Sequence, residues 1–367
     1  MKKLLLSLCM VLALTACKDE KNSAQTNEKP IIKIGASLPL TGNLAQVGQA
    51  GVNAMEMALD KWKKLDTKYD YKLVIENDMM KPQQANLNVQ KLINIDKVSA
   101  IMSLFGVVDR VVDDAANKQK VISMSCSYGK SDVPEYAINT GAQNEEIYDV
   151  ALKQLRKENV KTVSLMGSNA AVSNGILDYF VKHLAQDGIK VLTDERYGLE
   201  ERDYRISIQK SEALNPDYYL LMGVEPANSI WVKQYTELTG KKNFGSLGTF
   251  PQLQPGFWEY IENRWTVYLN GGTEEFVKEY NNRYNGATYG CTANMYDNLD
   301  ILITAFENTP LHAGAKIPTT GDVINYIHNL KTWNGMFGEF KIDPSGIAHP
   351  KIDVRVYRDG KFIKVEE

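Results

Sequence analysis

Short apolar runs alternate along the chain with segments in which apolar residues recur at helical spacing. Ile31–Leu38 is the first run, and the segment after it keeps helical spacing as far as Trp62. The alternation continues to a strand expected at Val121–Ser125. After a polar linker it restarts with a helix near Glu145–Asn159 and later includes a strand expected at Tyr218–Met222. Two successive series of this kind predict an α/β protein with two mainly parallel sheets, each flanked by helices.

The last part of the chain does not begin a third series. Thr273–Tyr284 and Thr292–Asn308 have helical spacing, and Gly338–Asp343 with Ile352–Tyr357 predict a terminal hairpin. Because these pieces are too few for a third sheet, we expect them to complete the two lobes already begun.

Ligands of open parallel sheets bind beyond the carboxyl ends of the strands, where loops and helix N-termini converge. This rule selects loops without any knowledge of function. The main ones are Phe105–Arg110, Ser125–Ser131, Gly167–Ser173, Gly223–Ala227 and Phe250–Phe257.

The N-terminus has the layout of a secretory signal. Lys2 and Lys3 precede an apolar run, Leu4–Leu14, that is shorter than the ~20 residues a membrane span needs. Leu14-Thr15-Ala16-Cys17 resembles the lipobox of bacterial lipoproteins. We therefore expect residues 1–16 to be removed, Cys17 to be lipidated, and residues 17–30 to form a polar tether.

Four cysteines occur in the chain. Cys9 and Cys17 belong to the signal and the anchor, which leaves Cys126 and Cys291. Disulfides persist in an export compartment, but separation in sequence says nothing of proximity in space. We expect these two to be buried small side chains rather than a disulfide.

Composition excludes several classes of protein. The 367 residues are 44% hydrophobic and 24% charged, unlike a disordered or polytopic membrane protein. A single core stops growing at roughly 250–300 residues, so two lobes are expected. Lys and Arg number 42 and Asp and Glu 45, a net charge of −3 that argues against a nucleic-acid partner.

The search for catalytic chemistry is mostly negative. No nucleophile elbow, zinc-protease motif or dinucleotide fingerprint occurs, and no histidine has a partner at metal-ligand spacing. Asp109 and Asp113 lie near the start of a predicted helix, where acids favour the helix dipole. We expect neither an enzyme nor a cofactor.

Several motifs, taken in order, carry a resemblance to a family. They include Ile34–Gly42 followed by Gly48, Asn77-Asp78, Tyr296-Asp297 and Phe337–Phe340 with Asp343 and Gly346. From Ile31 to its end the chain resembles type I periplasmic binding proteins of the branched-chain amino acid-binding family, which serve ABC importers. The resemblance implies a monomeric, extracytoplasmic protein whose two lobes close on a small molecule and deliver it to a permease.

The resemblance also implies three crossings between the lobes, near Thr140–Gln143, Leu269–Gly272 and Phe337–Gly338. Residues 31–141 and 271–337 would form lobe 1, and residues 142–270 and 338–367 would form lobe 2. A sensory protein of the same fold that hands its closed state to a receptor, and an enzyme using the cleft, are the alternatives that the sequence leaves open.

Ligand-binding positions follow from the same resemblance. They are Val47, Phe105, Gly106, Ser127, Tyr128, Gly129, Val172, Val224, Glu225 and Phe250. Most residues that bind the carboxylate and ammonium groups of an amino acid in the family are absent here. For example, Phe250 stands where relatives have an acid. We expect a ligand with an apolar or aromatic body and one carboxylate, held by the helix start at Gly106–Val108 with Ser127, Arg110 and Lys130. Phe250, Phe257 or Trp258 would pack against it, although a leucine-like amino acid remains the family default.

Overall fold

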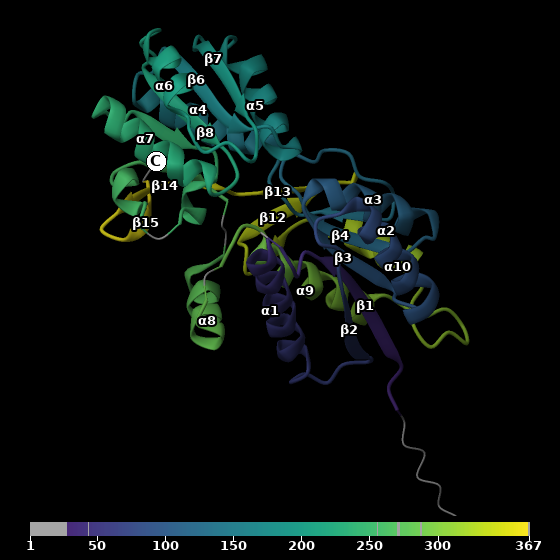
Figure 1. Ribbon diagram of the computed structural model, residues 1–367. Helices are drawn as coiled ribbons and strands as arrows, with labels where there is room; N and C mark the ends of the chain where they lie inside the picture. Colours follow the sequence, from purple (N-terminus) through teal and green to yellow (C-terminus); the bar gives the residue numbers. More distant parts are fainter. Residues whose placement is uncertain (1–27, 43, 255, 270–271, 287, 366–367) are drawn as a thin grey trace, which may run out of the picture.

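The computed structural model describes residues 28–42, 44–254, 256–269, 272–286 and 288–365. The chain forms two α/β lobes, each built around one sheet with helices on both faces, and several connecting segments join them (Figure 1). Residues 1–16 and Cys17, the predicted signal and lipidation site, lie outside the described residues, as does most of the predicted tether.

The sheet of the first lobe is wholly parallel, in the order β2-β1-β3-β4-β5. Its strands are β1 (Ile31–Leu38), β2 (Asp70–Asn77), β3 (Ala100–Leu104), β4 (Ile122–Cys126) and β5 (Ala137–Asn139). In β3, Met102 and Leu104 belong to one cluster of buried residues and Ile101 to another. Burial on both faces explains why this strand is apolar without alternation.

Helices cover both faces of this sheet. They are α1 (Ala45–Trp62), α9 (Thr292–Asn308) and α10 (Thr320–His328) on one face, with α8 (Glu274–Tyr284) packed beside them, and α2 (Pro82–Lys91) and α3 (Gly106–Lys118) on the other. A short π-helical turn, Leu92–Asp96, continues α2. α9 is buried along nearly its whole length, because it lies between the sheet, α1 and α10.

The second lobe has a seven-stranded sheet in the order β15-β14-β10-β9-β8-β6-β7. Its strands are β6 (Thr162–Ser168), β7 (Lys190–Tyr197), β8 (Tyr218–Met222), β9 (Phe244–Ser246), β10 (Trp265–Tyr268), β14 (Asp353–Arg358) and β15 (Lys361–Lys364). β14 runs antiparallel to its two neighbours, β10 and β15. Helices α4 (Asn144–Lys157) and α5 (Ala171–Leu184) cover one face, and α6 (Arg205–Glu212) and α7 (Ala227–Thr239) the other.

The predicted terminal hairpin is wrong. β12 (Glu339–Ile342) pairs with β11 (Trp333–Asn334) and β13 (Ala348–Pro350) in a small antiparallel sheet, whereas β14 pairs with β10 and β15. Phe340 and Ile342 are buried in the core of the first lobe. The chain therefore returns to the second lobe between β13 and β14, not at Phe337–Gly338, and the stretch up to Pro350 packs with the first lobe.

Other predicted elements match the structure closely. The strand Tyr218–Met222 and the helix Thr292–Asn308 have the bounds expected from the sequence. The short strand β5 was not predicted, since it falls within the stretch taken for a polar linker.

The first crossing between the lobes is tied to α9. Asn294 Nδ2 donates a hydrogen bond to the carbonyl oxygen of Thr140 at 2.8 Å, and Thr140 Oγ1 donates to Asn298 Oδ1 at 2.8 Å. All three side chains are buried. A rigid helix of the first lobe thus fixes the point at which the chain leaves that lobe.

Candidate functional site

The carboxyl ends of parallel strands from both lobes lie near the junction of the lobes. β3 and β4 end at Leu104 and Cys126, and β6 ends at Ser168. Helices α3 and α5, which begin just beyond the ends of β3 and β6, contact each other across the lobes. Since this is where open parallel sheets bind ligands, the loops that follow these strands form the candidate site.

The loop between β3 and α3 offers free backbone donors. Phe105 has a positive φ of 73°, a conformation that few residues other than glycine adopt, and it turns the chain into α3. No acceptor within the described residues takes the N–H groups of Gly106 and Val107. These amides at the positive end of the helix dipole favour an anionic group.

Ser127 begins the loop after β4 and is held on its main chain by Asn139. The N–H of Ser127 donates to Asn139 Oδ1 at 2.8 Å, and Asn139 Nδ2 donates to the carbonyl oxygens of Ser127 and Lys130, each at 2.9 Å. Asn139 Oδ1 also accepts from the N–H of Gly141 at 3.2 Å. One buried side chain therefore joins this loop to the first crossing between the lobes.

The side chains of the same loop bind two acids of α3. Ser127 Oγ hydrogen-bonds to Asp109, and Lys130 forms an ion pair with Asp113. Asp109 is fully buried, and the side chain of Lys130 is only 8% exposed. The expectation that Lys130 offers its charge to a ligand is therefore not met in this structure, because Asp113 already neutralises it. Arg110 is exposed to solvent.

Tyr128 and Gly129 lie at the junction rather than on an open surface. The Tyr128 hydroxyl donates to the carbonyl oxygen of Leu269 at 3.0 Å, and its ring packs against the cores of both lobes. Gly129 has a φ of +67°, and a Cβ there would lie 2.3 Å from Asn144 Oδ1. The structure thus gives Tyr128 a place in the hinge between the lobes.

Cys126 and Cys291 form a disulfide, so the prediction of two unpaired cysteines is wrong. Their Cα atoms are 5.8 Å apart, and both side chains are buried in the core of the first lobe. The bond joins the last residue of β4 to the residue before α9. It therefore fixes the base of the Ser127 loop without tying the two lobes together.

Val47 and the second lobe contribute mainly apolar side chains. Val47 and Val172 are half-buried in the first turns of α1 and α5, and Val224, beyond the end of β8, is 39% exposed. Glu225 follows it, and Ser229 Oγ donates to Glu225 Oε2 at 2.5 Å. Burial raises the pKa of Glu225 to about 7.

Two of the three aromatic side chains proposed to pack against a ligand lie in the core of the second lobe. Phe250 is fully buried and packs edge-on against Phe244, with 6.0 Å between the ring centroids. Trp258 packs against Tyr357 and Phe362 of the two last strands. An apolar residue after a strand can turn to the cleft or to the core, and here both rings turn to the core of the second lobe.

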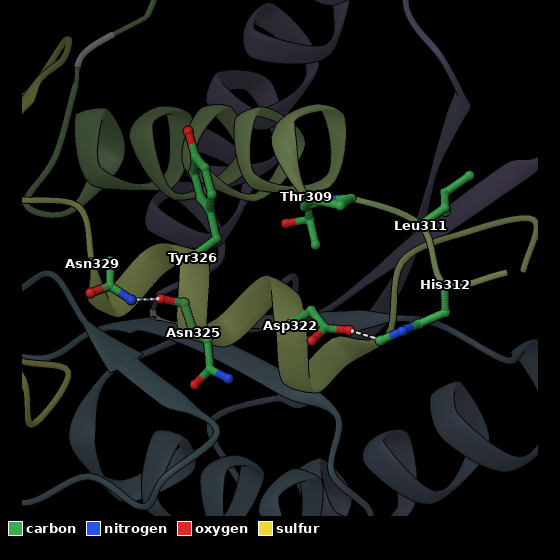
Figure 2. A pocket seen from close by; sticks show the side chains of 8 residues that line it. Thr309, Leu311, His312, Asp322, Asn325, Tyr326 and Asn329 are labelled. Carbon is green, nitrogen blue, oxygen red and sulfur yellow. Dashed lines mark hydrogen bonds and ion pairs between the residues drawn. The ribbon is translucent and has the colours of Figure 1, made fainter.

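Two hollows lie away from the strand ends. One, of about 290 Å³, lies beside the C-terminal end of α9 and is lined by Leu311, His312 and Asp322. His312 pairs with Asp322 at 2.8 Å (Figure 2). The other, of about 520 Å³, lies at the amino ends of β8 and β10, next to Asp217 and Arg264. Neither hollow contains a residue of the candidate site.

Sequence reasoning missed the buried role of Asp109 and Asp113. Both side chains are four residues apart and each directly follows a buried valine, Val108 or Val112. That spacing places the two acids on the same side of the helix, at the edge of the face that packs on the sheet. This pattern indicates a pair of buried acids, whereas the helix dipole alone does not. Nothing in the sequence pointed to Asn139.

Two kinds of feature are absent from the described part of the chain. No group of three or more His, Cys, Asp and Glu side chains there is arranged to hold a metal ion. No helix there is both long and apolar enough to cross a bilayer.

Comparison with known proteins identifies the family. A family model described as periplasmic binding protein matches residues 31–358. The fold resembles that of the substrate-binding protein LivJ of Streptococcus pneumoniae in complex with isoleucine, with a TM-score of 0.77 and 19% identity over 90% of this chain and 97% of that one.

Two further solved structures come from Rhodopseudomonas palustris. A solute-binding protein in complex with 3,4-dihydroxybenzoic acid has a TM-score of 0.77 at 19% identity, covering 92% of this chain and 96% of its own. A solute-binding protein in complex with benzoate has a TM-score of 0.75 at 15% identity, covering 91% and 95%. At such identities these likenesses show the fold, and the family model adds membership: the chain belongs to the periplasmic binding protein family.

Proposed function

We propose that this chain is an extracytoplasmic solute-binding protein of an ABC importer, which captures a small carboxylate-bearing ligand between its lobes and delivers it to the permease. The observation that carries the proposal is the pair of free amides at Gly106 and Val107, at strand ends where the two lobes meet. The lobes close on the ligand because the closed state gains contacts that the open state lacks. We propose that the protein acts as a monomer.

The anionic end of the ligand is assigned to the first lobe. Gly106 and Val107 offer N–H groups at a helix start, and Ser127 Oγ lies close by, since a Cβ on Gly106 would be 3.6 Å from it. Val172 and Val224 on the second lobe favour an apolar body. Among the structures with this fold, one is in complex with isoleucine and two with aromatic acids.

Whether the ligand carries an ammonium group depends on Glu225. It directly follows the exposed Val224, and its Oε1 is buried with no partner among the described residues. An ammonium group buried without a counter-ion costs several kcal/mol. An amino acid would therefore need Glu225 to ionise and turn toward it.

We expect calorimetry to show benzoate or 3,4-dihydroxybenzoate binding at least about tenfold more tightly than leucine, isoleucine or valine, since ~1.4 kcal/mol already gives that ratio. At a hundredfold excess over Kd the ligand should stabilise the chain by about 2.7 kcal/mol. Glu225→Gln should leave the binding of the aromatic acids unchanged.

Glu200→Gln is the matched control, because Glu200 is a fully exposed glutamate of the same lobe. Tight leucine binding that is lost in Glu225→Gln but kept in Glu200→Gln would show that the ligand is an amino acid. If none of the five compounds bound, the proposed ligand class would be rejected.

A further inference from the structure

The loop after β4 and helix α3 enclose a small charged cluster beneath the candidate site. It consists of two carboxyl groups, Asp109 and Asp113, and one ammonium group, Lys130, with 0%, 1% and 8% of their side chains exposed. Ser103 of β3 also faces Asp109, and the exposed Asp114 acts on Asp113 from the same helix. The hydroxyl groups of Ser123 and Ser127 face Asp113 and Asp109 in the same way, and they complete the charged and hydroxyl groups around the pair of acids.

The charges in this cluster do not balance if both acids are ionised. Lys130 pairs directly with Asp113, whereas the partner of Asp109 is the neutral hydroxyl of Ser127. A buried carboxylate without a counter-ion is costly, and it becomes neutral by keeping its proton. Burial accordingly raises the pKa of Asp109 to about 7, with Lys130 opposing the shift. Asp109 is therefore the carboxyl group of the cluster that stays protonated.

The state of Asp109 decides which way the Ser127 hydroxyl points. A carboxylate can only accept hydrogen bonds, so ionised Asp109 accepts one from the Ser127 hydroxyl. Ser127 Oγ can then offer a ligand only its lone pairs. A protonated Asp109 instead donates to Ser127 Oγ, and the Ser127 proton is then free to turn toward Gly106. There it would join the free N–H groups of Gly106 and Val107 as a third donor.

We propose that Asp109 is a specificity-determining residue of the site: in its protonated form it makes Ser127 a hydrogen-bond donor, so the first lobe selects a carboxylate and retains one proton when it binds. This inference rests on the proposed function, and it adds a residue that need not touch the ligand. When Asp109 is ionised before binding, its carboxylate takes up this proton from solvent. The O–H bond of Asp109 is the bond that forms.

The affinity for benzoate should then depend on pH, although benzoate itself does not titrate between pH 6 and 9. Above about pH 7, wild-type affinity should fall by up to about tenfold per pH unit, because binding must restore the proton on Asp109. Asp109→Asn keeps an N–H donor toward Ser127 at every pH, so its affinity should be constant. Asp114→Asn, on the exposed side of the same helix, should behave as wild type.

Infrared spectroscopy of the unliganded protein gives a second readout. The carbonyl stretch of a protonated carboxyl group should be present at pH 6, weaken by pH 8, and differ between wild type and Asp109→Asn. The difference spectrum isolates Asp109 from Glu225 and Asp297, whose pKa values burial also raises to about 7.

A difference spectrum without this band, or equal pH profiles for wild type and Asp109→Asn, would overturn the role of Asp109. The band together with the predicted profiles supports it. If the band is present but neither benzoate nor isoleucine binds at any pH, the proposed ligand class is rejected while the proton on Asp109 stands, so the two failures are distinguishable.

Discussion

Replacing both Cys126 and Cys291 with alanine should lower the free energy of unfolding by about 5 kcal/mol. The disulfide closes a loop between residues 165 apart in sequence, and chain entropy gives about this value for so long a loop, while measured losses usually lie at about 2–5 kcal/mol. That loop contains the helices and strands of the second lobe from α4 to β10. Urea unfolding followed by tryptophan fluorescence measures the change.

The wild-type protein in reductant provides the matched control. Reduction should shift its unfolding midpoint toward that of the double alanine variant and leave the variant itself unaffected. If the double alanine variant had the same unfolding midpoint as the oxidised wild type, the disulfide would not form in the protein.

Changing Cys17 to alanine should abolish lipid attachment. We propose that the mature chain begins at a lipidated Cys17, on the strength of the lipobox-like Leu14–Cys17 and the polar stretch after it. A single acyl chain gives only marginal, reversible membrane binding, so stable attachment requires more than one. The wild type should sediment with membranes, and Cys17→Ala should remain unprocessed or be released.

Cys9→Ala is the control for this experiment, since Cys9 lies within the apolar run of the same signal. It should be processed and anchored like the wild type. A mature N-terminus at any residue other than 17, found by mass spectrometry, would contradict the proposed anchor.

The elements that the sequence predicted well are those with strong local signals. A strand buried on both faces is a short apolar run, as at Tyr218–Met222, and a long helix shows apolar residues at helical spacing, as at Thr292–Asn308. β5 has only three residues, too few for such a signal. The pairing of β12 and β14 depends on distant partners, which explains why a hairpin was predicted there.

The candidate site was only partly predictable. Strand-end rules placed Phe105, Gly106 and Ser127 at the junction of the lobes, because the position of a loop follows from the order of elements. They could not tell whether Phe250 turns to the cleft or the core, since both surroundings accept an aromatic ring. The disulfide was missed for a related reason: proximity across 165 residues is a property of the fold.

The buried cluster around Asp109 marks a further limit of pattern reading. Two acids near a helix start favour the helix dipole in any fold. Only the packing of α3 on the sheet shows that Asp113 is neutralised by Lys130 and that Asp109 is not. The pairing of charges in this cluster thus follows from the folded structure and could not be predicted from the sequence pattern.

Small-angle X-ray scattering tests the central claim, that a ligand closes the two lobes. It should be measured on soluble mature chain carrying Cys17→Ala, with and without a saturating amount of a ligand that calorimetry has shown to bind one to one. The radius of gyration should fall on binding, because the lobes move together about the crossings. An unchanged radius of gyration with such a ligand bound would contradict the closing-lobe mechanism.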